Sequence, residues 1–143
     1  MARFTLLALA LAAPLALAQT PRSHEEVTAF VEAAGLDVCE SVPNDPPERA
    51  KSRGAIGKHL IEVAKDCTKR DPDNANVVFA FEFDTAKNRD MAVAQFIEMF
   101  EASFVDFGNA WSIGDRAAVF VSGPARGEIG LALQEEYLRR TAK

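Results

Sequence analysis

The chain has 143 residues, of which 48% are hydrophobic, and its formal net charge at pH 7 is −5. That length suits a single domain with one buried core. The acidic balance disfavours binding to nucleic acid or to an anionic membrane surface, because the basic residues are interleaved with Asp and Glu and form no patch.

Residues 1–18 are predicted to be a secretory signal peptide. They carry one charge, Arg3, followed by an apolar run that ends in Ala16-Leu17-Ala18, a small-x-small cleavage motif. The run is shorter than the ~20 apolar residues that a membrane-spanning helix needs, and Pro14 interrupts it. We therefore expect cleavage rather than anchoring.

Cleavage between Ala18 and Gln19 would leave residues 19–143 as a single mature domain. No cysteine lies at the predicted cut, so a lipoprotein anchor has no acceptor. We expect a secreted or periplasmic protein that does not insert into the membrane after signal removal.

The chain's two cysteines, Cys39 and Cys67, predict a disulfide bond. An exported protein meets an oxidising compartment, where paired cysteines usually form a bridge. They are too far apart for a redox C-x-x-C motif, and two thiols alone make a poor zinc site. Closing the loop between them would stabilise the fold by roughly 3–4 kcal/mol. No metal or cofactor is expected.

The first predicted element of the mature chain is a helix from Ser23 to Gly35. Ser23 and Glu26 form a capping box, and Gly35 suits the position after the last turn. Its apolar residues recur at helical spacing: Val27, Phe30, Val31 and Ala34. The proline-rich segment 41–54 predicts a surface loop, with a helical start after Pro46-Pro47 left open.

Residues 55–67 fit either a helix face or a strand face. Gly54 and Gly57 weaken a long helix, so we favour a strand that forms a hairpin with 77–83. The latter segment alternates strictly and places three phenylalanines on one face of a strand. These are Phe79, Phe81 and Phe83.

A central helix is predicted to begin at Asp84 or Thr85 and to cover this phenylalanine face. Its apolar stripe consists of Val93, Phe96, Ile97, Phe100 and Phe104. Gly114-Asp115 then lies between two apolar runs as a two-residue hairpin turn. A last helix is predicted after Gly123-Pro124. Its apolar side consists of Ile129, Ala132, Leu133 and Tyr137.

These elements predict a single small α+β domain in the order α-β-β-α-β-β-α. Its antiparallel sheet would carry helices mainly on one face, and the disulfide would tether the first helix.

Two short motifs follow the second cysteine: AxxRDxAV from Ala86 to Val93, and WxxGDRxxV from Trp111 to Val119. With the placement of the cysteines, they resemble a group of small exported proteins and lipoproteins of bacteria that carry no assigned function. The resemblance covers most of the mature chain and implies an α+β fold and a disulfide, but no activity. The chain departs from the group in lacking the lipoprotein cysteine. It also has alanines after the turn where the group often has a tryptophan.

No catalytic motif is present in the sequence. His24 is expected to be an exposed polar residue, and His59 with the nearby Glu62 would face different ways. The sequence contains no hydrolase elbow and no phosphate-binding glycine loop. Residues 71–74 begin like a calcium loop but lack its continuation, and therefore predict a solvated turn.

The sheet face opposite the phenylalanines is expected to be partly bare and to meet solvent at Glu82. The candidate partner surface there comprises Val78, Ala80, Trp111 and Phe120. The alternative is that Trp111 packs against a helix.

We expect a non-catalytic binding or interaction module of the cell envelope or secreted space, with a protein or small ligand as partner. The alternative is a small carboxylate-based hydrolytic enzyme, which needs two acids that converge in a pocket. A deep pocket lined by Glu82, Asp84 or His59 would favour this alternative. A third hypothesis is a stress-resistance or inhibitor protein that acts through surface contact alone.

Overall fold

The computed structural model describes residues 16–102, 110–122 and 126–142. The helices are α1 (Ala16–Ala33), α2 (Glu48–Lys51), α3 (Ala86–Ala102) and α4 (Arg126–Thr141). The strands are β1 (Asp37–Asn44), β2 (Ala55–Ala64), β3 (Asn76–Phe83), β4 (Ala110–Ile113) and β5 (Ala117–Ser122). Two short 3-10 helices, η1 (Cys67–Lys69) and η2 (Pro72–Asn74), connect β2 to β3.

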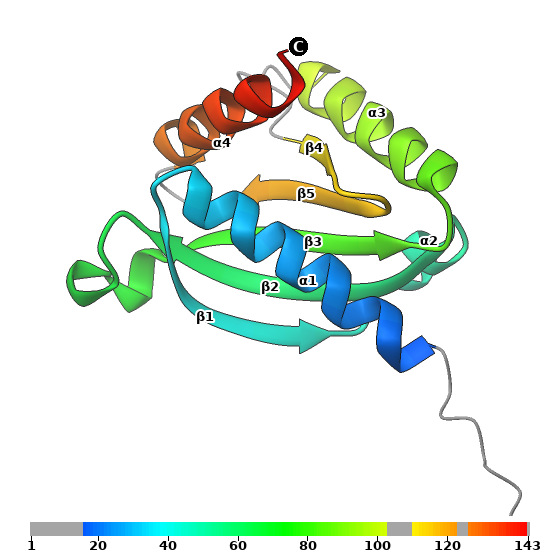
Figure 1. The fold of residues 1–143 in the computed structure, drawn as a ribbon, viewed down its shortest axis with the longest axis horizontal. Coiled ribbons are helices and arrows are strands. Elements are labelled where there is room, and N and C mark those ends of the chain that lie inside the picture. Colours follow the sequence, from blue (N-terminus) through cyan, green and yellow to red (C-terminus); the bar gives the residue numbers. More distant parts are fainter. Residues whose placement is uncertain (1–15, 103–109, 123–125, 143) are drawn as a thin grey trace, which may run out of the picture.

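All five strands form one antiparallel sheet in the order β1-β2-β3-β5-β4 (Figure 1). The α+β class is therefore confirmed, and residues 55–64 are a strand paired with β3, as favoured from the glycines. The predicted element order lacks two elements. β1 begins before the expected loop of residues 41–54 and runs into it, and α2 lies where a helical start after Pro46-Pro47 was left open. β1 is an edge strand that pairs only with β2. Its residues are mostly exposed and include Pro43, so it lacks the apolar alternation that identifies a strand.

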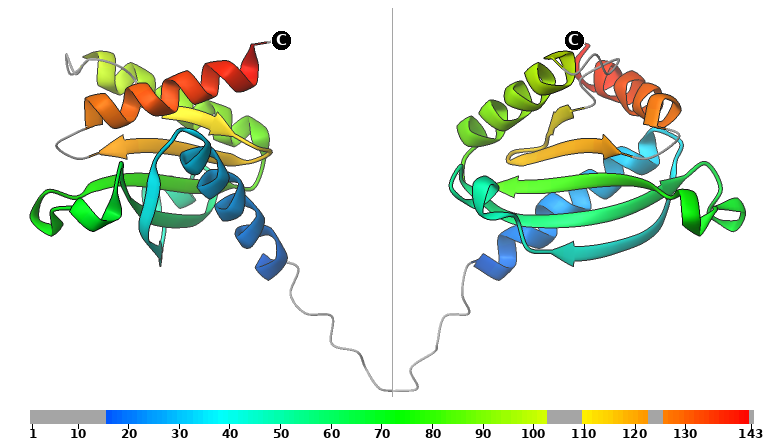
Figure 2. Two further views of the ribbon diagram at one scale, coloured as in Figure 1. Left: turned by 60° about the vertical axis from the view of Figure 1, so that its left-hand side comes forward. Right: turned by 180° about the vertical axis from the view of Figure 1, so that it is seen from behind.

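Helices cover both faces of the sheet, which corrects the prediction of helices mainly on one face. In Figure 1, α1 crosses in front of the sheet and α2 lies behind it. The view from behind in Figure 2 places α1 beyond the strands. The reason lies in β3, where one set of alternating side chains is Val77 and three phenylalanines and the other includes the apolar Val78 and Ala80. A strand with that composition is buried on both faces.

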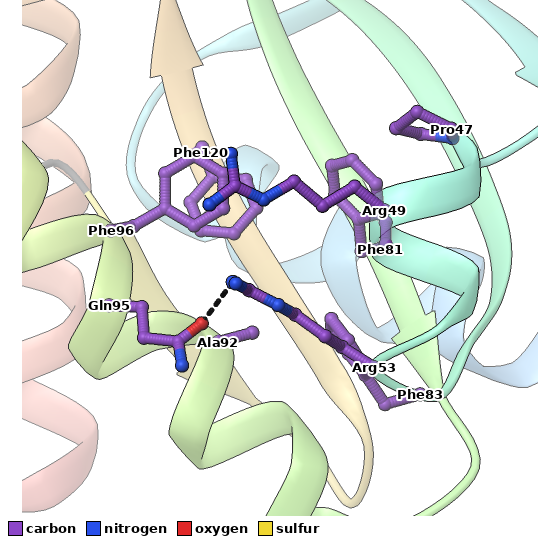
Figure 3. A pocket seen from close by; sticks show the side chains of 10 residues that line it. Pro47, Arg49, Arg53, Phe81, Phe83, Ala92, Gln95, Phe96 and Phe120 are labelled. Carbon is purple, nitrogen blue, oxygen red and sulfur yellow. Dashed lines mark hydrogen bonds between the residues drawn. The ribbon is translucent and has the colours of Figure 1, made fainter.

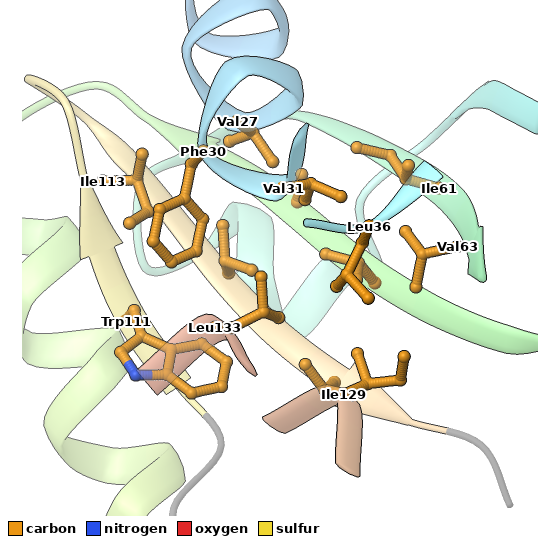
Figure 4. Packing of buried hydrophobic residues seen from close by; sticks show 14 of the residues in the cluster. Val27, Phe30, Val31, Leu36, Ile61, Val63, Trp111, Ile113, Ile129 and Leu133 are labelled. Carbon is orange, nitrogen blue, oxygen red and sulfur yellow. The ribbon is translucent and has the colours of Figure 1, made fainter. Parts of the chain in front are cut away.

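On the first face, α1 and α4 pack over the sheet and over each other (Figure 4). We call this the α1 face. Phe30 of α1 is fully buried, with its ring centroid 6.5 Å from that of Trp111 on β4. Trp111 donates its indole N–H to Gln134 of α4, at 2.6 Å. The predicted apolar side of the last helix is confirmed, since Ile129 and Leu133 are buried in this cluster.

On the opposite face, the α3 face, α3 covers the phenylalanines of β3, as predicted. Phe96 of α3 stacks on Phe120 of β5 at 3.7 Å between centroids, and Phe81 meets Phe120 edge-on at 5.5 Å. The predicted stripe residues Phe100 and Phe104 fall outside the described side chains.

α1 ends where predicted but begins earlier. Gly35 has φ +83° and donates its N–H to the Glu32 carbonyl, while Leu36 donates to the Val31 carbonyl, which together form a Schellman motif. Ser23, the predicted first cap, is instead a buried residue within the helix. The predicted cleavage point between residues 18 and 19 also lies within α1, and cleavage there stays a prediction.

The Cys39–Cys67 disulfide is confirmed, with its Cα atoms 5.4 Å apart. Cys39 lies at the register shift of β1 between Val38 and Glu40, so it is the extra residue of a β-bulge. Cys67 is the first residue of η1, in the turn segment that follows β2. The bridge therefore attaches the edge strand to the turn that follows its neighbour. It does not tether α1 directly.

The β4–β5 hairpin has a three-residue loop, because Ile113 pairs with Ala117. The predicted two-residue turn is wrong in length, although Gly114 is its first residue and has φ +57°. A Cβ on Gly114 would lie 1.7 Å from the Glu26 carboxylate of α1, so the Glu26 side chain would have to move, and the positive φ itself favours glycine.

Candidate ligand pocket on the α3 face

The predicted partner surface lies in the protein interior. Val78, Ala80 and Trp111 are buried under α1 and α4, and Phe120 is buried under α3 on the opposite face. The structure thus brings three of the four residues together but exposes none of them. The alternative that Trp111 packs against a helix is the one observed. The prediction that these residues are exposed was wrong, because the alternation of β3 does not reveal that α1 covers the second face of the sheet.

An apolar pocket of about 500 Å³ opens on the α3 face, between α2, α3 and the sheet (Figure 3). Four phenylalanines contribute to its wall: Phe81, Phe83, Phe96 and Phe120. Small side chains leave the space between the helices open, because Ala50 and Ala92 occupy positions where a longer residue would fill it. The volume falls within the ~300–1,000 Å³ range of small-molecule sites.

Two arginines stand at this pocket. Arg49 belongs to α2, and Arg53 lies in the turn between α2 and β2. Both are exposed. Figure 3 shows Arg49 extending toward Phe96 and Phe120, and Arg53 donating a hydrogen bond to the Gln95 side-chain carbonyl across the pocket.

A second, more polar hollow of about 430 Å³ adjoins the first. The two share Arg53, Ala92 and Gln95, so the Arg53–Gln95 hydrogen bond marks the boundary between them. Asp84 lines the second hollow and accepts a hydrogen bond from Asn88 at 2.8 Å. An apolar cavity and a more polar one therefore lie side by side, separated by this hydrogen bond.

The two histidines contact each other on the α1 face, whereas His24 was expected to be an exposed polar residue. Their ring centroids are 4.3 Å apart, and His24 Nε2 lies 2.7 Å from Ser41 Oγ of β1. Burial, and then the neighbouring His24 ring, lower the pKa of His59 below its ordinary value. The cavity that they line has a volume of only about 10 Å³, roughly enough for one water and too small for a substrate.

The carboxylates proposed for an enzyme do not converge. Glu82 was expected to meet solvent, but it is buried on the α1 face and forms an ion pair with Arg116 at 3.2 Å. Asp84 is exposed at the end of β3, beside α3. Sequence reasoning placed both on one face of an extended strand, whereas β3 ends at Phe83 and the chain turns into α3.

The acidic turn at residues 71–74 is a solvated turn, as predicted. Asp71 accepts hydrogen bonds from the Asn74 side chain and the Asp73 backbone, and these bonds lower the pKa of its carboxyl. Within the described ranges, no group of three or more His, Cys, Asp or Glu side chains is placed to hold a metal ion.

The pocket itself was missed from sequence. Its lining comes from four separate segments around residues 50, 82, 94 and 120, which no local pattern connects. The segment 41–54, which was predicted to be a loop, contains one sequence pattern that could have indicated the pocket. Arg49 and Arg53 are four residues apart, the spacing that places two side chains on the same side of a helical turn.

A scan against protein-family models and searches of curated proteins and of solved structures return no match for this chain. Within the described part of the chain, none of the helices combines the length and the apolar character that crossing a membrane requires.

Proposed function

We propose that this protein is a non-catalytic binding module whose pocket on the α3 face takes a small apolar ligand. The observation that carries the proposal is the aromatic pocket between α2 and α3. The pocket has a defined volume of about 500 Å³, so binding would not require the core to be rearranged. It also lies on the face where the apolar side chains are phenylalanines, which offer large contact area to a flat or extended molecule.

We further propose that the protein works in the periplasm or the secreted space. The apolar N-terminal segment with its small-residue cleavage site supports this location, and so does the Cys39–Cys67 disulfide. Apolar small molecules in such a compartment need a carrier or receptor, which a pocket of this kind supplies.

The competing enzyme hypothesis finds less support in the geometry. A hydrolytic site needs an acid and a base facing a space that holds the substrate. The lining of the large pocket includes no Asp, Glu or His among the described residues. His59 and Glu82 share a cavity, but its volume is only about 10 Å³.

A substitution at the pocket mouth tests the binding function. Gln95 is exposed on α3 and lines the pocket, so Gln95→Trp should place an indole across the mouth without disturbing the core. We expect the affinity for the neutral fluorescent probe N-phenyl-1-naphthylamine to fall about tenfold, because the indole occupies the contact area of the probe. Fluorescence titration of the mature protein measures this.

The matched control is Ala94→Trp, which adds the same side chain at the neighbouring exposed position outside the pocket lining. Its probe affinity should stay within about twofold of the unsubstituted protein, since scattered surface substitutions change little. Absence of probe binding to the unsubstituted protein, or equal losses in both variants, would refute the proposed site.

A further inference from the structure

The charges around the pocket differ from those of the whole chain. The protein has a net charge of −5, yet the charged residues in the described lining are two arginines and no acid. Lys58 adds a third positive charge on the same face, with its ammonium 5.3 Å from the centroid of the Phe81 ring. An acidic protein thus presents a locally positive opening to an apolar compartment.

The two guanidinium groups retain free hydrogen-bonding capacity. Among the described residues, the Arg49 guanidinium has no hydrogen-bond or ion-pair partner, and the Arg53 guanidinium donates only to the neutral Gln95 amide. The nearest acids on α2 and before it do not neutralise them, because Lys51 pairs with both Asp45 and Glu48. Arginine presents its N–H groups in a planar fork that matches a carboxylate.

We infer that the ligand of this pocket is a monocarboxylate with an apolar body. The body would lie among the phenylalanines, and the carboxylate would bind Arg49 and Arg53 at the opening. This inference rests on the proposed function, because it names the chemistry of the ligand in the same pocket. A neutral apolar molecule would gain no charge-assisted hydrogen bond from the two exposed guanidinium groups. A small inorganic anion would leave the phenylalanine walls uncovered.

A pair of ligands that differ only in the head group tests the inference. Dodecanoate and 1-dodecanol share one apolar chain, and each can be titrated against the bound neutral probe at about pH 7.5, where the carboxylate is ionised. We expect dodecanoate to displace the probe at about tenfold lower concentration than dodecanol, since hydrogen bonds to a charged group are the stronger ones. Added salt should weaken dodecanoate binding and leave dodecanol binding unchanged.

Substitution of Arg49 tests whether the preference for dodecanoate over dodecanol arises at the pocket opening. Arg49→Gln should reduce dodecanoate affinity about tenfold and leave dodecanol affinity unchanged, because it removes a charge and leaves the apolar wall intact. Arg70→Gln is the control, since it removes another exposed arginine that does not line the pocket. Equal displacement by the two ligands, with no effect of Arg49→Gln, would overturn the carboxylate inference while the binding function stands. Failure of the probe itself to bind would instead overturn the proposed function.

Discussion

Arg89 connects α3 to the β4–β5 hairpin through a single buried guanidinium. One of its terminal nitrogens lies 3.1–3.4 Å from the carbonyl oxygens of Ile113, Gly114 and Ala117. Its Nε donates to Asp90, and Asp90 in turn accepts from Ser112 Oγ at 3.0 Å. The two sequence motifs that begin at residues 86 and 111 therefore meet in space.

Loss of this guanidinium should destabilise the fold. Arg89→Met keeps much of the apolar stem but leaves buried carbonyl groups without their donor, so we expect the free energy of unfolding to fall by about 1–3 kcal/mol. Urea denaturation measures the change. Lys87→Met is the matched control on an exposed position of the same helix, and it should change stability by less than about 0.5 kcal/mol. Equal effects of the two substitutions would contradict the structural role of Arg89.

Helical periodicity could not predict that Arg89 is buried, for a physical reason. Arg89 lies mostly off the apolar stripe of α3, and an arginine in that position is normally solvated. It is buried because distant carbonyl groups of the hairpin turn accept its hydrogen bonds, and those acceptors become neighbours only after folding. Glu82 was missed for the same reason, since its partner Arg116 lies on the hairpin loop.

Among the secondary-structure elements, α1 contacts β2 through His24 and His59, whose rings are tilted by 36° with their centroids 4.3 Å apart. The pKa of His59 in the folded protein lies below its ordinary value of 6.5, chiefly because of burial. As pH falls through 6.5, the unfolded chain therefore binds more protons than the folded one. The linked stability is fully present above 6.5 and is lost as pH falls toward the folded pKa.

Acidification should therefore loosen the packing of α1 on β2. We expect the free energy of unfolding to decrease between about pH 7.5 and about pH 5.5, and to decrease less in His59→Gln, which removes the titrating ring. Urea denaturation of both proteins at the two pH values makes the comparison. A variant that loses as much stability as the unsubstituted protein would show that other groups carry the pH dependence. Glu82, which lines the same small cavity, is the first of those to test.

The helices and strands with a clear apolar periodicity were predictable from the sequence, and those without one were not. β3 and α4 were predicted from alternation and helical spacing, and β2 was favoured over a helix because of its glycines. β1 could not be predicted, since an edge strand with exposed side chains and a proline has no apolar pattern. The candidate pocket also depends on α2, a helix of four residues that lies in the segment predicted as a loop.

At the scale of the whole molecule, the disulfide should contribute much of the resistance to unfolding. It closes a loop of 28 residues in sequence separation, and the chain-entropy estimate for such a loop is roughly 3–4 kcal/mol. β1 has a strand partner on one side only, so it depends on this bridge more than a central strand would. We expect reduction to lower the urea midpoint and to release β1 first.

Urea denaturation with and without reductant, combined with hydrogen exchange, tests this expectation. The Cys39→Ser/Cys67→Ser variant should resemble the reduced protein and should not respond further to reductant. Equal midpoints for the oxidised and reduced protein would contradict the contribution of the bridge. The fold class and this bridge were predictable from sequence, but the coverage of both sheet faces was not, because it depends on where distant helices pack.

The packing of Phe30 links the first and last parts of the chain. Its ring lies beside Trp111, and the Arg140 guanidinium of α4 lies 5.3 Å from its centroid. During synthesis on a ribosome, α1 emerges before Trp111 and before α4. The nascent chain must therefore hold an apolar helix face exposed until its final helix appears. The core that these residues share can form only after the last residues of the chain have been released.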